Sequence, residues 1–150
     1  MSRIILLDSG PLGLVTNPTA SPTAEACNQW MEARLVERVR VVVPEITDYE
    51  VRRELLRANK VAGLARLDAL KKSIGFIPIT TDAMLMAAGF WADARRQGRP
   101  TADNKALDAD VILAAQAVLL DSPEDEAVIA TTNVGHLSRY ARAQRWEEIE

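Results

Sequence analysis

Short apolar runs alternate along this 150-residue chain with longer segments of helical spacing. The strand-like runs lie at residues 4–7, 39–43, 75–79 and 127–130, and a last strand is expected to open at 145–146. The helical segments are expected at about 21–38, 47–59, 61–73, 82–97, 108–120 and, as a short helix, 133–143. This alternation predicts an α/β fold, a three-layer α/β/α sandwich in which helices cover both faces of a central parallel sheet.

Length and composition fit one domain spanning residues 1–150 with a single core. Hydrophobic residues make up 48% and charged residues 26%, as in an ordinary globular protein. The apolar run at the N-terminus stops at Asp8, too early for a signal-peptide core, so we expect a cytoplasmic protein. A net charge of −3 disfavours a protein that coats nucleic acid through overall charge, but a nuclease with cation-binding carboxylates remains compatible.

The metal-binding side chains of the sequence are almost all oxygen donors. Cys27 is the single cysteine and His136 the single histidine, which excludes an internal disulfide and zinc sites built from several histidines. A lone histidine is more typical of packing or surface hydrogen bonding than of catalysis. Carboxylate and amide oxygens favour Mg²⁺ or Mn²⁺ over zinc.

Asp8 directly follows the first predicted strand, and ligands of open α/β sheets bind beyond the carboxyl ends of the strands. The alternative is a turn or helix-capping aspartate, because Ser9, Gly10 and Pro11 predict a turn here. Its position at a strand end favours a functional carboxylate.

Two further polar residues are expected at the same edge of the sheet. Glu50 lies in the first turn of the helix predicted at 47–59, where Thr47 and Glu50 also fit a capping box. The two roles of Glu50 are compatible. Asn133 follows the strand at 127–130, and its alternative role is a helix N-cap.

Asp108 and Asp110 open the apolar helix predicted to follow a polar loop. The helix dipole alone favours acids in a first turn, by about 0.3–1 kcal/mol each. Asp110 is followed at helical spacing by Ala114 and Ala117, so it lies over a buried, small-residue face. Residues two apart on a helix do not share a face, so Asp110 is the stronger candidate and Asp108 contributes only as an N-cap residue. Asp103 is a weaker candidate in the loop.

Basic residues near these acids are candidates for binding a phosphate backbone. Arg53 and Arg57 follow Glu50 at helical spacing and could guide phosphates, although pairing with Glu50 or Glu54 on a solvated face explains them equally well. A second basic patch is formed by Arg95, Arg96 and Arg99.

The order and spacing of these motifs resemble the PIN-domain family, and specifically the VapC-type toxins of bacterial toxin–antitoxin pairs. The resemblance covers nearly the whole chain and is carried by residues 5–9, 46–51, 110–117 and 129–133, with His136 and Leu137. It implies a metal-binding aspartate at Asp8, a glutamate at Glu50, an aspartate at Asp110, and a fourth acid or amide at Asn133. The sequence departs from the family pattern in having asparagine at 133 and a second aspartate at 108.

The resemblance further implies a five-stranded parallel sheet, homodimerisation, RNA cleavage and inhibition by an antitoxin encoded alongside. We therefore expect a Mg²⁺- or Mn²⁺-dependent endoribonuclease in which Asp8 and Asp110, with Asp108 as a further candidate, hold the metal. Glu50 and Asn133 complete the catalytic set, and Arg53 and Arg57 bind substrate. The ions would orient a phosphodiester and lower the pKa of bound water.

Three other functions are compatible with parts of this pattern. A Mg²⁺-dependent phosphotransfer protein also has an aspartate after its first strand, but it usually needs a second acid two residues on or a lysine after a late strand. This chain has Gly10 at the first place, and Asn133 is followed by valine and glycine. A PIN-like module that only binds protein or RNA stays open because of Asn133. A DNA-directed nuclease of the same fold is less favoured, because the short chain lacks long insertions that would shape a DNA arch.

Overall fold

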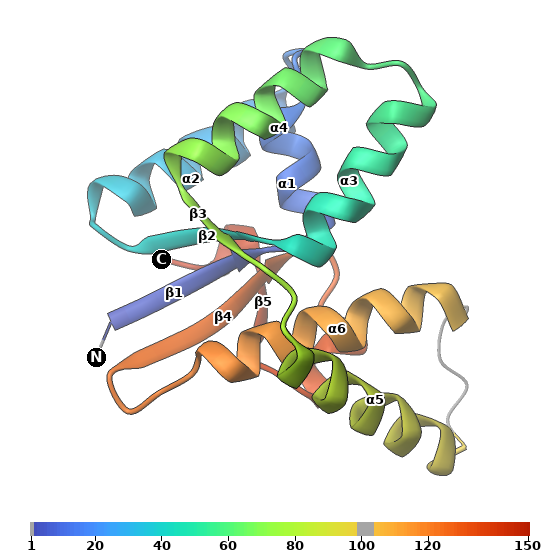
Figure 1. Ribbon diagram of the computed structural model, residues 1–150. Helices are drawn as coiled ribbons and strands as arrows, with labels where there is room; N and C mark the ends of the chain where they lie inside the picture. The colour runs from blue at the N-terminus through green and yellow to red at the C-terminus, as the bar shows by residue number, and fades with distance from the viewer. Residues whose placement is uncertain (1, 99–103) are drawn as a thin grey trace.

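A five-stranded sheet forms the centre of the computed structural model, which describes residues 2–98 and 104–150 (Figure 1). Its order is β3-β2-β1-β4-β5, and every neighbouring pair is parallel. The strands are β1 (Ser2–Leu7), β2 (Arg40–Pro44), β3 (Gly75–Ile77), β4 (Asp125–Thr131) and β5 (Ala143–Arg145). The predicted parallel sheet is confirmed, including its five strands.

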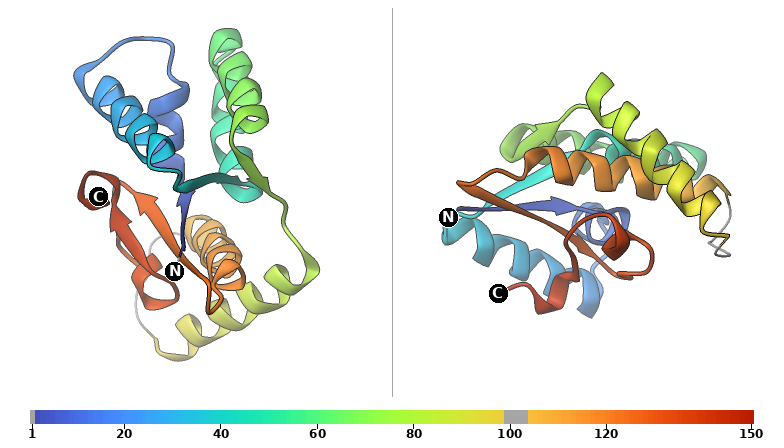
Figure 2. Two further views of the ribbon diagram at one scale, coloured as in Figure 1. Left: turned by 90° about the vertical axis from the view of Figure 1, so that its left-hand side faces the viewer. Right: turned by 90° about the horizontal axis from the view of Figure 1, so that it is seen from below.

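Helices cover both faces of the sheet, which confirms the predicted α/β/α arrangement (Figures 1 and 2). One face carries α1 (Ser9–Thr16), α2 (Pro22–Val36), α3 (Glu45–Arg57) and α4 (Val61–Ser73). The other carries α5 (Thr81–Arg96) and α6 (Asn104–Leu120), and two 3-10 turns, η1 (Leu137–Arg139) and η2 (Trp146–Glu148), lie near the C-terminus. No helix in the described ranges is both long and apolar enough to cross a membrane.

The buried strand β1 shows how the sequence specifies two apolar layers. Ile5 and Leu7 pack into the cluster beneath α1 to α4, whereas Ile4 and Leu6 pack into the cluster beneath α6. Successive strand residues point to opposite faces, and both faces are covered, so the whole run must be apolar.

Helix α5 packs on α6 through small side chains. Ala83, Ala87 and Ala94 contact Val111 and Ala115 in a third apolar cluster. The bulkier α5 residues Met84, Leu85 and Trp91 remain exposed.

The turn predicted after Asp8 is wrong, because this segment forms helix α1. The backbone N–H of Ser9 donates to Asp8 Oδ1 at 2.7 Å, so Asp8 is the N-cap of α1 as well as the residue after β1. Pro11 lies in the first turn, where a backbone N–H has no intrahelical acceptor, and so it does not interrupt the helix.

The capping box predicted for α3 is also wrong, because the helix begins at Glu45. The Thr47 hydroxyl donates to the Pro44 carbonyl at 3.0 Å instead of capping the helix. The Glu45 carboxylate accepts from the backbone N–H of Ile79 at 2.6 Å and so ties α3 to the segment after β3. Glu50 therefore lies in the second turn of α3.

Two further predicted boundaries differ from the structure. Helix α6 begins at Asn104, so Asp108 and Asp110 lie beyond its first turn, and the helix-dipole explanation for them is wrong. The short helix predicted over 133–143 is only the 3-10 turn η1, followed by β5.

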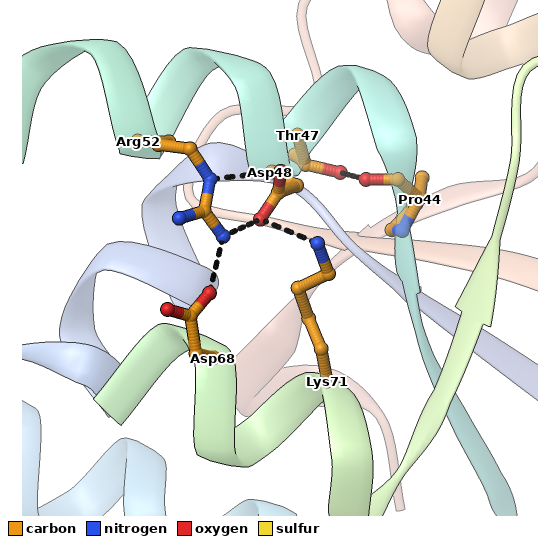
Figure 3. A network of polar contacts seen from close by, with 6 residues as sticks. All are labelled: Pro44, Thr47, Asp48, Arg52, Asp68 and Lys71. Atoms are coloured by element: carbon orange, nitrogen blue, oxygen red, sulfur yellow. Dashed lines mark hydrogen bonds and ion pairs between the residues drawn. The ribbon is translucent and has the colours of Figure 1, made fainter. Parts of the chain in front are cut away.

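An ionic network centred on the buried Asp48 fixes α3 against α4 (Figure 3). Arg52 donates to both oxygens of the Asp48 carboxylate and, at 2.7 Å, to Asp68 on α4. Lys71 of α4 lies 3.5 Å from the Asp48 carboxylate and 4.4 Å from the centre of the Phe76 ring. The network therefore holds the part of α3 that carries Glu50.

Candidate functional site

The candidate site lies where the direction of strand succession reverses. From β1 the chain adds β2 and β3 on one side of the sheet and later β4 and β5 on the other, so β1 and β4 are neighbours at the switch point. Such points are where ligands bind in open α/β sheets. Asp8 directly follows β1 here, and its backbone N–H donates to the Ala130 carbonyl at 2.9 Å.

Thr131, the last residue of β4, orients the Asp8 carboxylate. Its buried hydroxyl donates to Asp8 Oδ2 at 2.7 Å and accepts from the backbone N–H of Asn133 at 3.1 Å. Because Ser9 binds the other oxygen, the carboxylate is fixed by hydrogen bonds from both sides. Burial raises the pKa of Asp8, and the hydrogen bonds from Thr131 and Ser9 partly oppose that rise.

Glu50 of α3 and Asp110 of α6 lie close enough to Asp8 for their charges to interact. Burial, with the negative charges of Asp8 and Asp110, raises the pKa of Glu50 to about 7, while Arg53 acts in the opposite direction. Burial and then the charge of Asp8 raise the pKa of Asp110 to about 6. Three segments far apart in sequence thus bring three partly buried carboxylates together, here called the carboxylate cluster.

The carboxylate cluster has the donor chemistry of a hard-cation site. In residues 2–98 and 108–150, whose side chains the structure describes, no three Asp, Glu, His or Cys side chains are already arranged to hold a metal ion directly. Within the same ranges, Glu50 and Asp110 have neither a side-chain hydrogen bond nor a salt bridge. Mutual repulsion between carboxylates is relieved by a cation, and oxygen ligands suit Mg²⁺ and Mn²⁺. The residues therefore fit such an ion, with water as part of its coordination.

The other predicted acids and amides lie outside the cluster or outside the described residues. The Asn133 backbone is tied to Thr131, but its side chain is exposed. Asp108 is exposed and lines a hollow between α5 and α6 with Met84 and Trp91. The structure therefore brings Asp110, and not Asp108, beside Asp8. Asp103 lies outside the described residues.

The predicted basic residues separate into paired and available cations. Arg57 pairs with Glu54 at 2.8 Å on the exposed side of α3, which is the solvated pairing considered for it. Arg53 lines a groove of about 640 Å³ between α1 and α3 together with Glu50, and its guanidinium lies 5.1 Å from the centre of the Tyr49 ring.

The second basic patch is engaged locally. Arg96 pairs with Asp93, and the Arg95 guanidinium lies 4.8 Å from the centre of the Trp91 ring. Arg99 lies outside the described residues.

Sequence reasoning missed Ser9 and Thr131, which hold Asp8 in place. The sequence did contain a signal for both residues, because each carries a side-chain hydroxyl beside a candidate residue at a strand end. Ser9 directly follows Asp8, and Thr131 lies two residues before Asn133. A separate hollow of about 650 Å³, lined by Arg3, Arg139 and Arg142 among others, contains none of the three carboxylates.

The fold is shared with chains of several solved structures. A chain in the crystal structure of VapBC2 from Rickettsia felis, bound to a DNA fragment from its promoter, superposes with a TM-score of 0.74 at 14% identity, covering 95% of this chain and 98% of that one. A chain of FitAcB from Neisseria gonorrhoeae gives 0.69 at 20% identity, with 97% and 99% covered. A chain of VapBC-1 from nontypeable Haemophilus influenzae gives 0.67 at 18% identity, with the same coverage.

No family model and no curated protein sequence matches this chain. In each superposition nearly all of this chain and nearly all of the matched chain are covered. The sequence identities are too low to show more than a shared fold. The protein has a PIN-like α/β fold. The resemblance to VapC-type proteins drawn from the sequence motifs is confirmed at that level.

Proposed function

We propose that this protein is a Mg²⁺- or Mn²⁺-dependent endoribonuclease and the toxin of a type II toxin–antitoxin pair. The observation that supports this proposal most strongly is the carboxylate cluster at the β1/β4 switch point, in which burial and the charge of Asp8 raise the pKa of both Glu50 and Asp110. The fold shared with chains of VapBC and FitAcB structures supports the toxin assignment. RNA is favoured over DNA because the short chain lacks insertions that would enclose a DNA duplex.

In this mechanism the chain's own residues hold and orient the reacting groups. Asp8 and Asp110, with Glu50, would bind one or two divalent ions, which supply an activated water and neutralise charge on the leaving oxygen. Thr131 keeps the Asp8 carboxylate in one orientation. Arg53, beside Glu50 in the groove, would bind the substrate phosphate, and the Asn133 amide would hold a water or phosphate without adding charge.

The test is cleavage of RNA by purified protein in Mg²⁺, in Mn²⁺ and in a chelator, with Asp110→Asn and Asp108→Asn as a matched pair on α6. We expect cleavage only when the ion is present. Loss of a ligand at Asp110 should lower the rate at least about 10-fold, whereas the exposed Asp108 should matter less than about 3-fold. Cleavage in the chelator, or undiminished cleavage by Asp110→Asn, would overturn the proposal.

A cognate antitoxin is the proposed protein partner. The support is the fold shared with chains of the VapBC and FitAcB structures. A small DNA-binding protein encoded directly upstream should copurify with this chain when the two are expressed together. An antitoxin role for that neighbour is rejected if it neither copurifies nor lowers RNA cleavage.

We also propose a homodimer through the exposed apolar side chains of α5, which are Met84, Leu85 and Trp91. Leu85→Lys is expected to shift the mass in solution from twice the 16.5 kDa chain mass to a single chain. Val36→Lys, which alters an even more exposed apolar side chain on α2, is the matched control and should stay dimeric. Light scattering after size exclusion measures both. A monomeric wild type, or dissociation by the control, contradicts this interface.

A further inference from the structure

Tyr49 presents an aromatic ring to solvent beside the carboxylate cluster. It directly precedes Glu50 on α3 and is 55% exposed, more than any other aromatic residue in the described part of the chain. Four of the other rings pack in pairs: Trp30 lies against Trp146, and Phe90 stacks on Tyr140. Phe76 and Trp91 have a lysine or arginine over the ring, and Trp91 is distant in sequence from Glu50. The Tyr49 side chain therefore contributes little to core packing. A large aromatic ring exposed next to Glu50 needs an explanation other than fold stability.

Arg53 joins this ring to the candidate site. One turn along α3, its guanidinium lies 5.1 Å from the centre of the Tyr49 ring, within the range of a cation–π contact. The same side chain lines the groove with Glu50, and its charge lowers the pKa of Glu50. No carboxylate in residues 2–98 and 108–150 forms a salt bridge with Arg53, although Arg52 and Arg57 on the same helix are both paired.

We propose that Tyr49 and Arg53 form a binding subsite for one unpaired RNA base and its phosphate, next to the carboxylate cluster. This inference rests on the proposed function and narrows its substrate to RNA that is single-stranded at this point. The ring stacks on the base, and the guanidinium contacts the phosphate, which leads the strand from Tyr49 past Arg53 into the groove that contains Glu50.

An unpaired base suits this surface better than a duplex. The bases of an A-form helix are stacked inside it, and its deep, narrow groove does not admit side chains, so an exposed ring reaches only splayed bases. Stacking of a base on an aromatic side chain contributes about 1–3 kcal/mol and tolerates any base. The subsite therefore selects RNA by strandedness and only weakly by base identity.

The test compares binding of a fluorescently labelled single-stranded RNA with that of a duplex of the same length, by anisotropy. Ca²⁺ replaces Mg²⁺, and a gel confirms that the RNA stays intact. Tyr49→Ala should weaken single-strand binding roughly 5- to 100-fold, the range that corresponds to the stacking energy, and should leave duplex binding unchanged. Tyr49→Phe should retain wild-type binding because the ring remains.

Leu56→Ala is the matched control, because Leu56 is 57% exposed on the same helix and lacks a ring. It should bind both RNAs as the wild type does. An equal loss for single strand and duplex in Tyr49→Ala, or a Phe variant as weak as the Ala variant, overturns the subsite. So does a Tyr49→Ala protein that binds RNA normally but fails to copurify with its antitoxin, since the ring would then contact protein.

The outcomes separate this subsite from the catalytic proposal. If Tyr49→Ala shows the selective binding loss but the wild type cleaves no RNA with any ion, the subsite holds and the nuclease assignment fails. If cleavage is metal-dependent but Tyr49→Ala changes neither Kd nor KM, the nuclease assignment holds and the subsite fails.

Discussion

Asp8→Asn is expected to reduce RNA cleavage about 100-fold or more while the protein stays folded. Among the described residues, Asp8 is the carboxylate whose charge acts on both Glu50 and Asp110, so losing it removes the centre of the proposed cation site. Asparagine can keep both hydrogen bonds, accepting from Ser9 and donating to Thr131 Oγ1, and it is as good an N-cap as aspartate. Electrostatic contributions of this kind are worth about 10²–10³ in rate.

Initial cleavage rates and a thermal melt of the same preparations measure this prediction. Asp125→Asn is the control, because Asp125 begins β4 and so lies at the amino ends of the strands, away from the carboxylate cluster. This substitution should change the cleavage rate less than about 3-fold. Undiminished cleavage by Asp8→Asn would refute the mechanism. A loss that accompanies unfolding would instead assign Asp8 a structural role alone.

Glu50→Gln is expected to act on stability in opposite directions with and without metal. Burial and the charges of Asp8 and Asp110 raise the pKa of Glu50 from 4.5 to about 7, so the folded protein binds this proton more tightly than the unfolded chain. Stability of the metal-free protein must then fall as pH rises from 4.5 through about 7. Glutamine removes that fall and should stabilise the metal-free protein at pH 8 by about 1 kcal/mol, after discounting for solvent screening.

When Mg²⁺ or Mn²⁺ is present, we expect the wild type to be more stable than Glu50→Gln. The ion should raise the melting temperature of the wild type by more at pH 8 than at pH 5, because ligand carboxylates must be ionised. Glu50→Gln should lose much of that gain. Melting temperatures at the two pH values, with and without the ion, test both halves of this prediction.

Glu54→Gln is the control for this experiment, since Glu54 is exposed and pairs with Arg57 outside the cluster. It should keep the wild-type response to the ion. If neither ion changes the melting temperature of the wild type, the result supports a non-catalytic binding module and contradicts the metal site.

The sheet and most helices could be predicted because periodicity is a local signal. The run at 4–7 is apolar on both faces of a strand, and the hydroxyl of Ser21 caps α2 by accepting from the Ala24 N–H. Helix α1 was missed because Gly10 and Pro11 are local turn signals, and only the Asp8 cap and the packing of Leu12 favour a helix there. The start of α3 depends on the contact between Glu45 and Ile79, which spans 34 residues and has no local signature.

The acids of the site were predictable from their place after strands and on helices, but the roles of their neighbours were not. Choosing between Asp108 and Asp110 required only helix geometry, and the structure places Asp110 with the cluster. The pairing of Arg57 and the availability of Arg53 depend on side-chain positions that spacing does not specify. Tyr49 has no periodic signal at all, since one exposed ring on a helix resembles ordinary surface.

Asp8 completes the backbone of α1 and also faces the site, which gives it two separate reasons to be retained during evolution. A homologue without catalytic activity would still need a capping residue at the position of Asp8. Glu50 and Asp110 make no side-chain hydrogen bond in the described structure, so such a homologue could replace them without losing a contact. Among homologues of this chain, the aspartate at the strand end is therefore a poor marker of an active enzyme. The pair on α3 and α6 is the better diagnostic.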